Sequence, residues 1–573
     1  MSASHRRLFP LFGAAAVAIV GMFPSAPAVA QDRWEGAYLA AQHAFTRNDY
    51  LNAAAEFARL LELDPTAPVS REQAVVANLA IGDFGAAILN ARQMQMKGMT
   101  GEAAQLALFL ERIARQDHKL VVDFIESGRG GGPLVDGLSM GWALLGQGRL
   151  DVALQAFDHV GQQGARGLAD YNAALALAAD GQFDRAERAM AGDGTPLHFT
   201  RRAIIAHVQM LSQLGRRDDA LELLRERFAA DAPADIEVLR RALNAGATLP
   251  FDIVRTPREG VAEVFFDVAG ALEGELAQQD LLIYLRAAEY LRPDHVDATI
   301  SAARLLSSLG QHALAEQSYQ RVPQGHPLYH TAELGRAEAL YDSGAVEAAL
   351  DVLAALADSH DALAEVHVTT GDLLRREERF GEAAEAYDRA LARIAEPDQR
   401  HWSIYYTRGI SHEREGAWEL AEADFRKALE LQPDQPHVLN YLGYSLVELD
   451  RNLDEALDMI ERAVTARPDD GYITDSMGWV LFKLGRYDEA VTYMERAAEL
   501  MPNDPIVNDH LGDVYWAVGR RMEARFQWRR ALSFDPEPEE AERIRRKLDV
   551  GLDAVLREET QEQPSWRGAS SGG

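Results

Sequence analysis

A regular step of 34 or 35 residues in the last third of the chain most constrains its fold. Glycines stand at Gly409, Gly443, Gly478 and Gly512, spaced by 34, 35 and 34 residues. A stack of similar units is indicated rather than one compact core, because self-similarity at a fixed period is typical of repeat architectures. Other residues keep the step: Ala421, Ala456, Ala490 and Ala524; Ala428, Ala463, Ala497 and Ala531; Phe425, Ile460, Met494 and Trp528; Pro433, Pro468, Pro502 and Pro536.

The pattern has a steric reading within one unit. Gly478 on a first helix and Ala490 on a second would let the two backbones approach closely, and Met494 would fill the space beside them. Pro502 would end the second helix because it cannot donate to the helical ladder. Glycine, alanine, bulky residue, alanine and proline at these offsets resemble the tetratricopeptide repeat, a helix–turn–helix unit. The resemblance implies an all-α superhelical solenoid of antiparallel helix pairs.

Weaker copies of the unit extend back towards the N-terminus, as in "RFGEAAEAYDRAL" and "YLNAAAEFARLLELDPTAP". An interruption with two prolines, two glycines and a β-branched run, from Asn244 to Gly260, separates the stronger copies from the weaker ones. We therefore expect these segments: 1–30, a signal peptide; 31–245, degenerate helical repeats; 246–260, an irregular connector; 261–400, further repeats; 401–537, four clear units; 538–557, a charged amphipathic capping helix; 558–573, a disordered tail.

The first thirty residues have the layout of an export signal. A short basic start at Arg6 and Arg7 precedes an apolar run that is too short and too rich in proline for a membrane span. Ala28-Val29-Ala30 is the small-x-small pattern that signal peptidase cleaves, which predicts a periplasmic protein beginning at Gln31. Both the general and the twin-arginine export routes stay open, and the sequence predicts no transmembrane segment in the mature chain.

Charge and cysteine content limit the partners. Loss of Arg6 and Arg7 would take the formal charge from −31 to −33. Such a chain repels nucleic acid, whose binding depends on Lys and Arg, and would attract a basic surface on a protein. The acidity is equally consistent with simple solubility. The absence of cysteine excludes disulfides, thiolate metal sites and a lipid-anchored N-terminal cysteine.

Several motifs resemble catalytic or metal sites, and none has the context that such a site requires. "GLSMG" around Ser139 matches a nucleophile elbow, but a glycine-rich loop precedes it where the motif needs a strand. His326 and His330 are one turn apart without a third ligand. We therefore predict no enzyme activity, cofactor or metal; a hydrolase that uses Ser139 is the unlikely alternative.

The stretch "DHLGDVYW" combines packing residues with a second set on another helical face. Gly512 fills the repeat glycine position, whereas Asp509, Asp513 and Trp516 recur on one face at i, i+4 and i+7. In tetratricopeptide repeats this face of the first helix lines the inner groove that binds partner segments, although packing between neighbouring units would explain the same pattern. The predicted protein-binding residues, here called the ladder, are Tyr406, Asn440, Tyr444, Asp475, Trp479, Phe482, Asp509, Asp513 and Trp516.

Phrases such as "VLNYLGYSLVEL" and "DGYITDSMGWVLFKLGRYDEAV" resemble repeat proteins of Gram-negative bacteria, especially alphaproteobacteria. A related group consists of adaptor lipoproteins that bring carboxy-terminal processing proteases to cell-wall-hydrolase substrates. The resemblance implies a non-enzymatic envelope scaffold, and its partner would be an envelope protease or a protein of cell-wall or outer-membrane assembly. A scaffold for polysaccharide export or outer-membrane assembly is the alternative, and the oligomeric state is left open.

Overall fold

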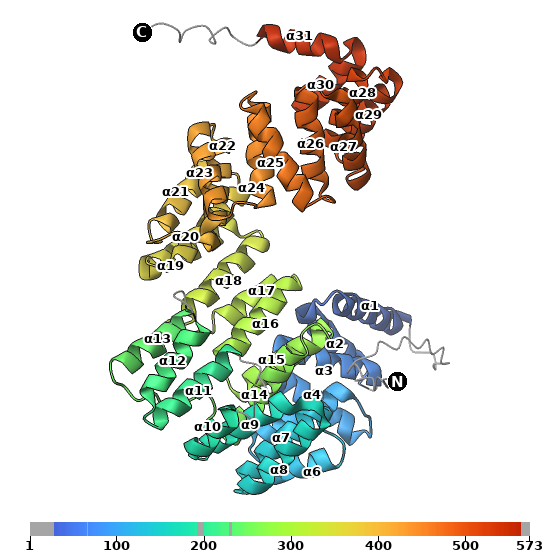
Figure 1. The fold of residues 1–573 in the computed structure, drawn as a ribbon. Helices are drawn as coiled ribbons and strands as arrows, with labels where there is room; N and C mark the ends of the chain where they lie inside the picture. Colours follow the sequence, from blue (N-terminus) through green and yellow to red (C-terminus); the bar gives the residue numbers. More distant parts are fainter. Residues whose placement is uncertain (1–27, 66, 192–199, 229–231, 563–573) are drawn as a thin grey trace, which may run out of the picture. The chain divides into compact units, whose positions relative to one another are not determined.

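The computed structural model describes residues 28–65, 67–191, 200–228 and 232–562, and within these ranges the regular structure is helical (Figure 1). The all-α class predicted from the repeat is confirmed, and consecutive helices form antiparallel pairs. The chain divides into two compact units, Met1–Leu356 and Ala357–Gly573. Most of the predicted signal segment and of the C-terminal tail lies outside the described residues.

The first unit contains α1 to α18 and most of α19. Their bounds are α1 (Ala28–Thr46), α2 (Tyr50–Leu63), α3 (Pro68–Ile81), α4 (Phe84–Met96), α5 (Glu102–Ala114), α6 (His118–Glu126), α7 (Pro133–Gly146), α8 (Leu150–Val160), α9 (Arg166–Ala179), α10 (Phe183–Ala191), α11 (Arg201–Gln213), α12 (Arg217–Arg227), α13 (Ala234–Asn244), α14 (Pro257–Ala271), α15 (Gln278–Leu291), α16 (Val296–Ser308), α17 (His312–Tyr319), α18 (Tyr329–Asp342) and α19 (Val346–His360).

The second unit contains the four clear repeats and the C-terminal helices. Its helices are α20 (Ala364–Arg376), α21 (Phe380–Leu391), α22 (Trp402–Arg414), α23 (Trp418–Leu431), α24 (Pro436–Glu448), α25 (Leu453–Ala466), α26 (Gly471–Lys483), α27 (Tyr487–Leu500), α28 (Pro505–Ala517), α29 (Arg521–Leu532), α30 (Pro538–Val550) and α31 (Leu552–Glu562). Each clear repeat is one pair, from α22 with α23 to α28 with α29.

The repeat glycines lie where the two helices of a pair approach most closely. A Cβ atom placed on Gly478 would lie 2.7 Å from Met494 Cγ, and one on Gly512 would lie 2.5 Å from the Trp528 ring. Real Cβ atoms are essentially never found so close to another heavy atom. The same relation joins Gly443 to Ile460 and Gly409 to Phe425. The steric reading of the repeat is therefore correct at all four glycines.

Unit 1 departs from a simple array because α14 and α15 contact helices far earlier in the sequence. α14 packs on α7 and α9, and α15 packs on α3 and α5. A Cβ atom on Gly260 of α14 would lie 2.2 Å from the Trp142 ring of α7. Tyr290 of α15 stacks on Phe84, with ring centroids 4.2 Å apart. The first helices of the N-terminal pairs therefore bury one face against later helices of the same chain, whereas repeats in a plain solenoid contact only their neighbours.

The segment between α13 and α14, residues 245–256, is non-helical, and the last four residues of the predicted connector, 246–260, lie in α14. Both sides of the segment belong to unit 1. Leu249, Ile253 and Val254 are buried there. The segment is thus part of the folded core. Among the described residues, no helix is both long and apolar enough to cross a membrane.

Candidate protein-binding face

The ladder residues lie on the first helices of the four clear repeats. Those on α26 and α28 are mostly enclosed: Asp475, Trp479, Phe482, Asp509 and Asp513 are buried. Trp516 and the ladder residues of α22 and α24 are half-buried. Much of the predicted set is therefore covered by the chain's own residues.

The α28 carboxylates hold a lysine from the C-terminal helix α30. The Lys547 ammonium donates to Asp509 Oδ2 at 2.7 Å and to both carboxylate oxygens of Asp513 at 2.7 and 2.8 Å. Arg543 of α30 lies 3.8 Å from each carboxylate. Lys547 is fully buried. The last rung of the ladder is therefore occupied by two basic side chains of a charged helix of the same chain.

Asp513 has a second partner from the paired helix. The Trp528 indole nitrogen donates to Asp513 Oδ1 at 2.9 Å. Burial raises the pKa of Asp513 and the charge of Asp509 adds to this, although the Lys547 ammonium acts in the opposite direction. Such a carboxylate needs a cation beside it to stay ionised.

A buried ion pair joins the next rung to α28. His510 Nδ1 lies 3.0 Å from Asp475 Oδ2. Burial alone would lower the pKa of His510, but the carboxylates of Asp475, Asp509 and Asp513 outweigh it and raise that pKa. Asp475 is thereby engaged inside the protein, so it is not free to supply the polar contact to a partner that the sequence suggested.

Protein groups also cover the ladder tryptophans. The Trp479 ring stacks on Phe482 and on His510, with centroid distances of 4.9 and 3.9 Å. The Trp479 side chain is only 6% exposed. The Trp516 indole donates to Asp553 Oδ2 at 3.0 Å and has the Arg521 guanidinium 3.8 Å from its ring centroid. Both tryptophan rings are thus in contact with side chains of the same chain on the face that the sequence predicted to bind a partner.

The ladder residues of α22 and α24 are more accessible. Tyr406 meets Tyr441 edge-on, with ring centroids 5.8 Å apart. Burial raises the pKa of Tyr444, and the nearby charges of Glu448, Asp475 and Glu540 raise it further. Glu540 belongs to α30, so the charge of that helix also acts on α24. Sequence reasoning expected α30 as a cap but missed that it occupies the ladder.

The motif around Ser139 is not a nucleophile elbow. Ser139 lies inside α7 and is fully buried, and a Cβ atom on Gly141 would lie 2.4 Å from the Phe157 ring. The strand–turn–helix context of that motif is replaced by the packing of a repeat pair. His330 is buried at the start of α18. Over the described ranges, no cluster of three or more His, Asp or Glu residues is arranged to hold a metal ion.

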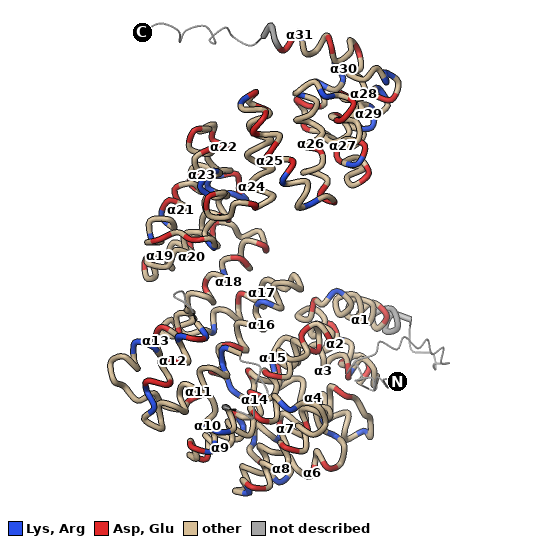
Figure 2. The backbone as a smooth tube through the Cα atoms, viewed as in Figure 1, with Lys and Arg blue, Asp and Glu red and all other residues tan. Residues whose placement is uncertain are grey.

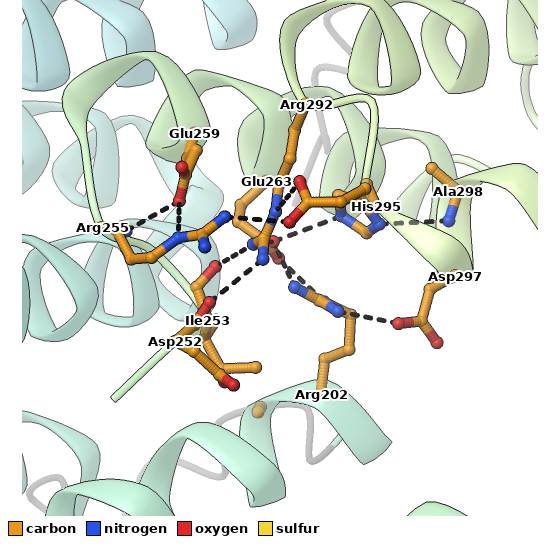
Figure 3. A network of polar contacts seen from close by, with 12 residues as sticks. Arg202, Asp252, Ile253, Arg255, Glu259, Glu263, Arg292, His295, Asp297 and Ala298 are labelled. Atoms are coloured by element: carbon orange, nitrogen blue, oxygen red, sulfur yellow. Dashed lines mark hydrogen bonds and ion pairs between the residues drawn. The ribbon is translucent and has the colours of Figure 1, made fainter. Parts of the chain in front are cut away.

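A second polar cluster lies in unit 1 (Figure 3). Arg202 Nε donates to Glu263 Oε2 at 3.0 Å, and His295 Nε2 lies 3.2 Å from Glu263 Oε1. Arg292 donates to the backbone carbonyls of Asp252 and Ile253. Burial alone would raise the pKa of Glu263, but Arg202 and His295 hold it at about 2. A carboxylate this acidic is a poor general base. The bonds from Arg292 instead hold the non-helical segment in place.

Three parts of the chain match models of the tetratricopeptide repeat: residues 300–364, 368–436 and 475–504. These segments are tetratricopeptide repeats. Proteins of this kind are generally protein-binding scaffolds without catalytic activity, and stacked repeats offer extended binding surfaces. The third segment contains Asp475, Trp479 and Phe482 of the ladder.

A tetratricopeptide repeat-containing protein of Pseudomonas aeruginosa is 28% identical over 193 residues, which are 33% of this chain and 32% of that protein. The match thus spans about a third of either length. The crystal structure of the APC/C hetero-tetramer Cut9–Hcn1 aligns over 92% of this chain and 98% of the other chain, with 14% identity and a TM-score of 0.37. A tetratricopeptide repeat protein from Parabacteroides merdae aligns over 46% and 98%, with 17% identity and a TM-score of 0.36.

Proposed function

We propose that the chain is a non-enzymatic scaffold of the cell envelope that binds segments of other proteins along the ladder of its second unit. The observation that supports this most is the burial of Lys547 between Asp509 and Asp513. A face that takes up the lysine of a charged amphipathic helix of its own chain has the chemistry to take up a lysine-bearing helix from a partner. Grooves that bind amphipathic helices are a common mode of peptide recognition.

The charge of the molecule supports a protein partner over nucleic acid. Acidic residues are spread along both units with basic residues among them (Figure 2), and the formal charge is −31. Such a field repels phosphate backbones and steers basic protein surfaces towards the molecule. The partner we propose is a basic helical or extended segment of an envelope protein.

The envelope location rests on the export signal at residues 1–30, with cleavage after Ala30 in the periplasm. An adaptor that presents substrates to an envelope protease is the first choice, on the resemblance to adaptor lipoproteins. A scaffold for polysaccharide export or outer-membrane assembly is the second. The two differ in the protein recovered with the scaffold, a protease with its substrate or a stable export complex.

Affinity purification from periplasmic extract with matched baits tests the binding face. Tyr444→Ala removes a half-buried ladder ring, whereas Tyr472→Ala removes a ring that is 61% exposed at the start of α26 and is not part of the ladder. Truncating an aromatic anchor commonly costs about 2 kcal/mol or more of binding energy. We expect Tyr444→Ala to lose the specific partner and Tyr472→Ala to keep it. Equal recovery by both baits would place the binding surface elsewhere.

A further inference from the structure

Helix α30 has fewer buried residues than the repeat helix α28 and as many as α29. Its buried residues are Ala541, Ile544 and Lys547, at i, i+3 and i+6, whereas nine of the thirteen residues of α28 are buried. The segment that leads into α30, residues 533–537, is non-helical and largely exposed. α30 therefore lies on the ladder by one narrow stripe of its surface.

The strongest contact in that stripe is electrostatic. Lys547 gives three short hydrogen bonds to Asp509 and Asp513, whereas the apolar part of the stripe is one isoleucine and one alanine. The cost of removing buried charges from water offsets much of the attraction of a buried ion pair. Such a contact selects strongly for a lysine at one position while adding little net stability.

The ladder has hydrogen-bond acceptors that α30 leaves unused. Among the described side chains of the ladder, Asn440 Oδ1 and Asp509 Oδ1 are buried without a hydrogen-bond partner. Buried acceptors normally have a donor, and an unmatched one costs free energy. A helix with an additional donor near these oxygens would satisfy more of the ladder than α30 does.

We propose that α30 is an intramolecular ligand of the ladder, and that the partner is a helix of another protein with an apolar residue followed three positions later by a lysine. The partner displaces α30 by placing its lysine between Asp509 and Asp513. The identity of such a partner rests on the proposed function. The occupancy and release of α30 can be tested without it.

The test uses full-length protein and a fluorescein-labelled peptide with the sequence of residues 538–557. Lys547→Glu places a negative charge against two carboxylates and should release α30 from the ladder. Arg545→Glu is the matched control, because it makes the same charge change on the same helix at an arginine whose side chain is 60% exposed. We expect the peptide to bind Lys547→Glu at least about tenfold more tightly than wild type or Arg545→Glu.

A peptide that carries Glu at the position of Lys547 should bind none of the three proteins. Equal peptide binding by Lys547→Glu and Arg545→Glu would overturn the proposal and identify α30 as a permanent element. These outcomes need no external partner. If the peptide test fails but the affinity purification recovers a partner, the scaffold function stands without a displaceable α30. If the peptide test succeeds but no partner is recovered, only the intramolecular role of α30 is supported.

A second measurement uses only wild-type protein, so that it does not depend on the folding of a variant. Hydrogen exchange should be at least about tenfold faster for α30 amides than for α28 amides. A large excess of the native peptide should accelerate exchange in α30 further, and the Glu-containing peptide should not. Exchange in α30 that is as slow as in α28 and unchanged by the native peptide would overturn the proposal.

Discussion

Lys547 and Asp513 form an ion pair enclosed by the protein, with Nζ 2.7 Å from Oδ2 and at most 1% of either side chain exposed. This pair connects the C-terminal helix to the last repeat. The sequence predicted a capping helix and a carboxylate-bearing face as two separate features. The structure combines them, because the cap supplies the cation that the face requires.

Lys547→Met should make the C-terminal end of unit 2 sensitive to pH. Without the ammonium, Asp509 and Asp513 face each other, and the pKa of Asp513, already raised by burial, rises further. A raised pKa gives a stability contribution that is complete below the ordinary value of about 4 and is lost as the pH rises through the raised value. The protection factors of α28 amides, which correct for the chemical exchange rate at each pH, should therefore be higher at pH 5 than at pH 8.

The control for this experiment is Lys427→Met, which removes the exposed ion pair with Glu430. Surface pairs contribute little, so its exchange should match that of wild type at both pH values. A Lys547→Met protein with the same α28 protection factors at pH 5 and pH 8 would contradict the prediction.

Gly478→Leu should destabilise unit 2 locally. Its side chain would be forced against Met494, and overpacking a well-filled core typically costs about 1–3 kcal/mol. Loss of exchange protection should centre on α26 and α27, because repeats contact mainly their neighbours. Gly381→Leu is the control, since a Cβ atom there would meet only ordinary contacts with Glu415. Unchanged protection in Gly478→Leu would show that the glycine is not a packing position.

The four clear repeats were predictable because their structure follows from local sterics. Gly478 and Met494 are close in sequence, and their contact is repeated at the same offset in each unit. Ladder positions followed from the same register. The contacts that bury Asp475 under His510 and Asp513 under Lys547 could not be predicted in this way. Helical spacing defines which residues share a face but not which residues cover that face.

The return of α14 and α15 onto the N-terminal helices was not predictable from periodicity. The contact between Gly260 and Trp142 joins residues more than one hundred positions apart, and no repeat offset encodes it. The proline and glycine signals overlap the non-helical segment before α14 and extend four residues into that helix. They gave no information on whether it separates two bodies or lies within one, and the buried Val254 belongs to the core of unit 1.

Asp280→Asn should stabilise unit 1 at alkaline pH. Asp280 lies on α15, is buried, and has one carboxylate oxygen without a hydrogen-bond partner among the described residues. Burial, with a smaller contribution from Glu102, raises its pKa to about 7. Its protonated form therefore favours folding below about pH 4, and this contribution is lost as the pH rises through 7.

Denaturant unfolding at pH 5 and pH 8 measures the effect of Asp280→Asn. We expect a gain of roughly 1–3 kcal/mol at pH 8, the usual cost of a buried polar group left unsatisfied, and a smaller change at pH 5. Asp294→Asn is the control, because its carboxylate pairs with Arg255 and Arg292 and should give no gain. A loss of stability in Asp280→Asn at pH 8 would contradict the prediction.

Export of the chain should end with cleavage after Ala30. Intact-mass spectrometry of the protein from periplasmic extract should give a chain that begins at Gln31. Ala30→Leu should block cleavage, because signal peptidase requires a small residue there. An uncleaved wild-type chain in the membrane fraction would indicate an N-terminal anchor.

The two carboxylates around Lys547 should differ in importance. Asp513 accepts two hydrogen bonds from the ammonium and one from the Trp528 indole, whereas Asp509 accepts one through a single oxygen. Asn in place of Asp513 keeps one acceptor oxygen for these donors, so a buried donor is left unmatched at a cost of about 1–3 kcal/mol.

Asp509→Asn removes a like charge beside Asp513 as well as a partner of Lys547, and these effects oppose each other. Denaturant unfolding and α30 exchange should therefore show a clear loss for Asp513→Asn and a small change for Asp509→Asn. If Asp509→Asn lowers the stability more than Asp513→Asn does, Asp509 is the more important partner of Lys547 and the prediction is wrong.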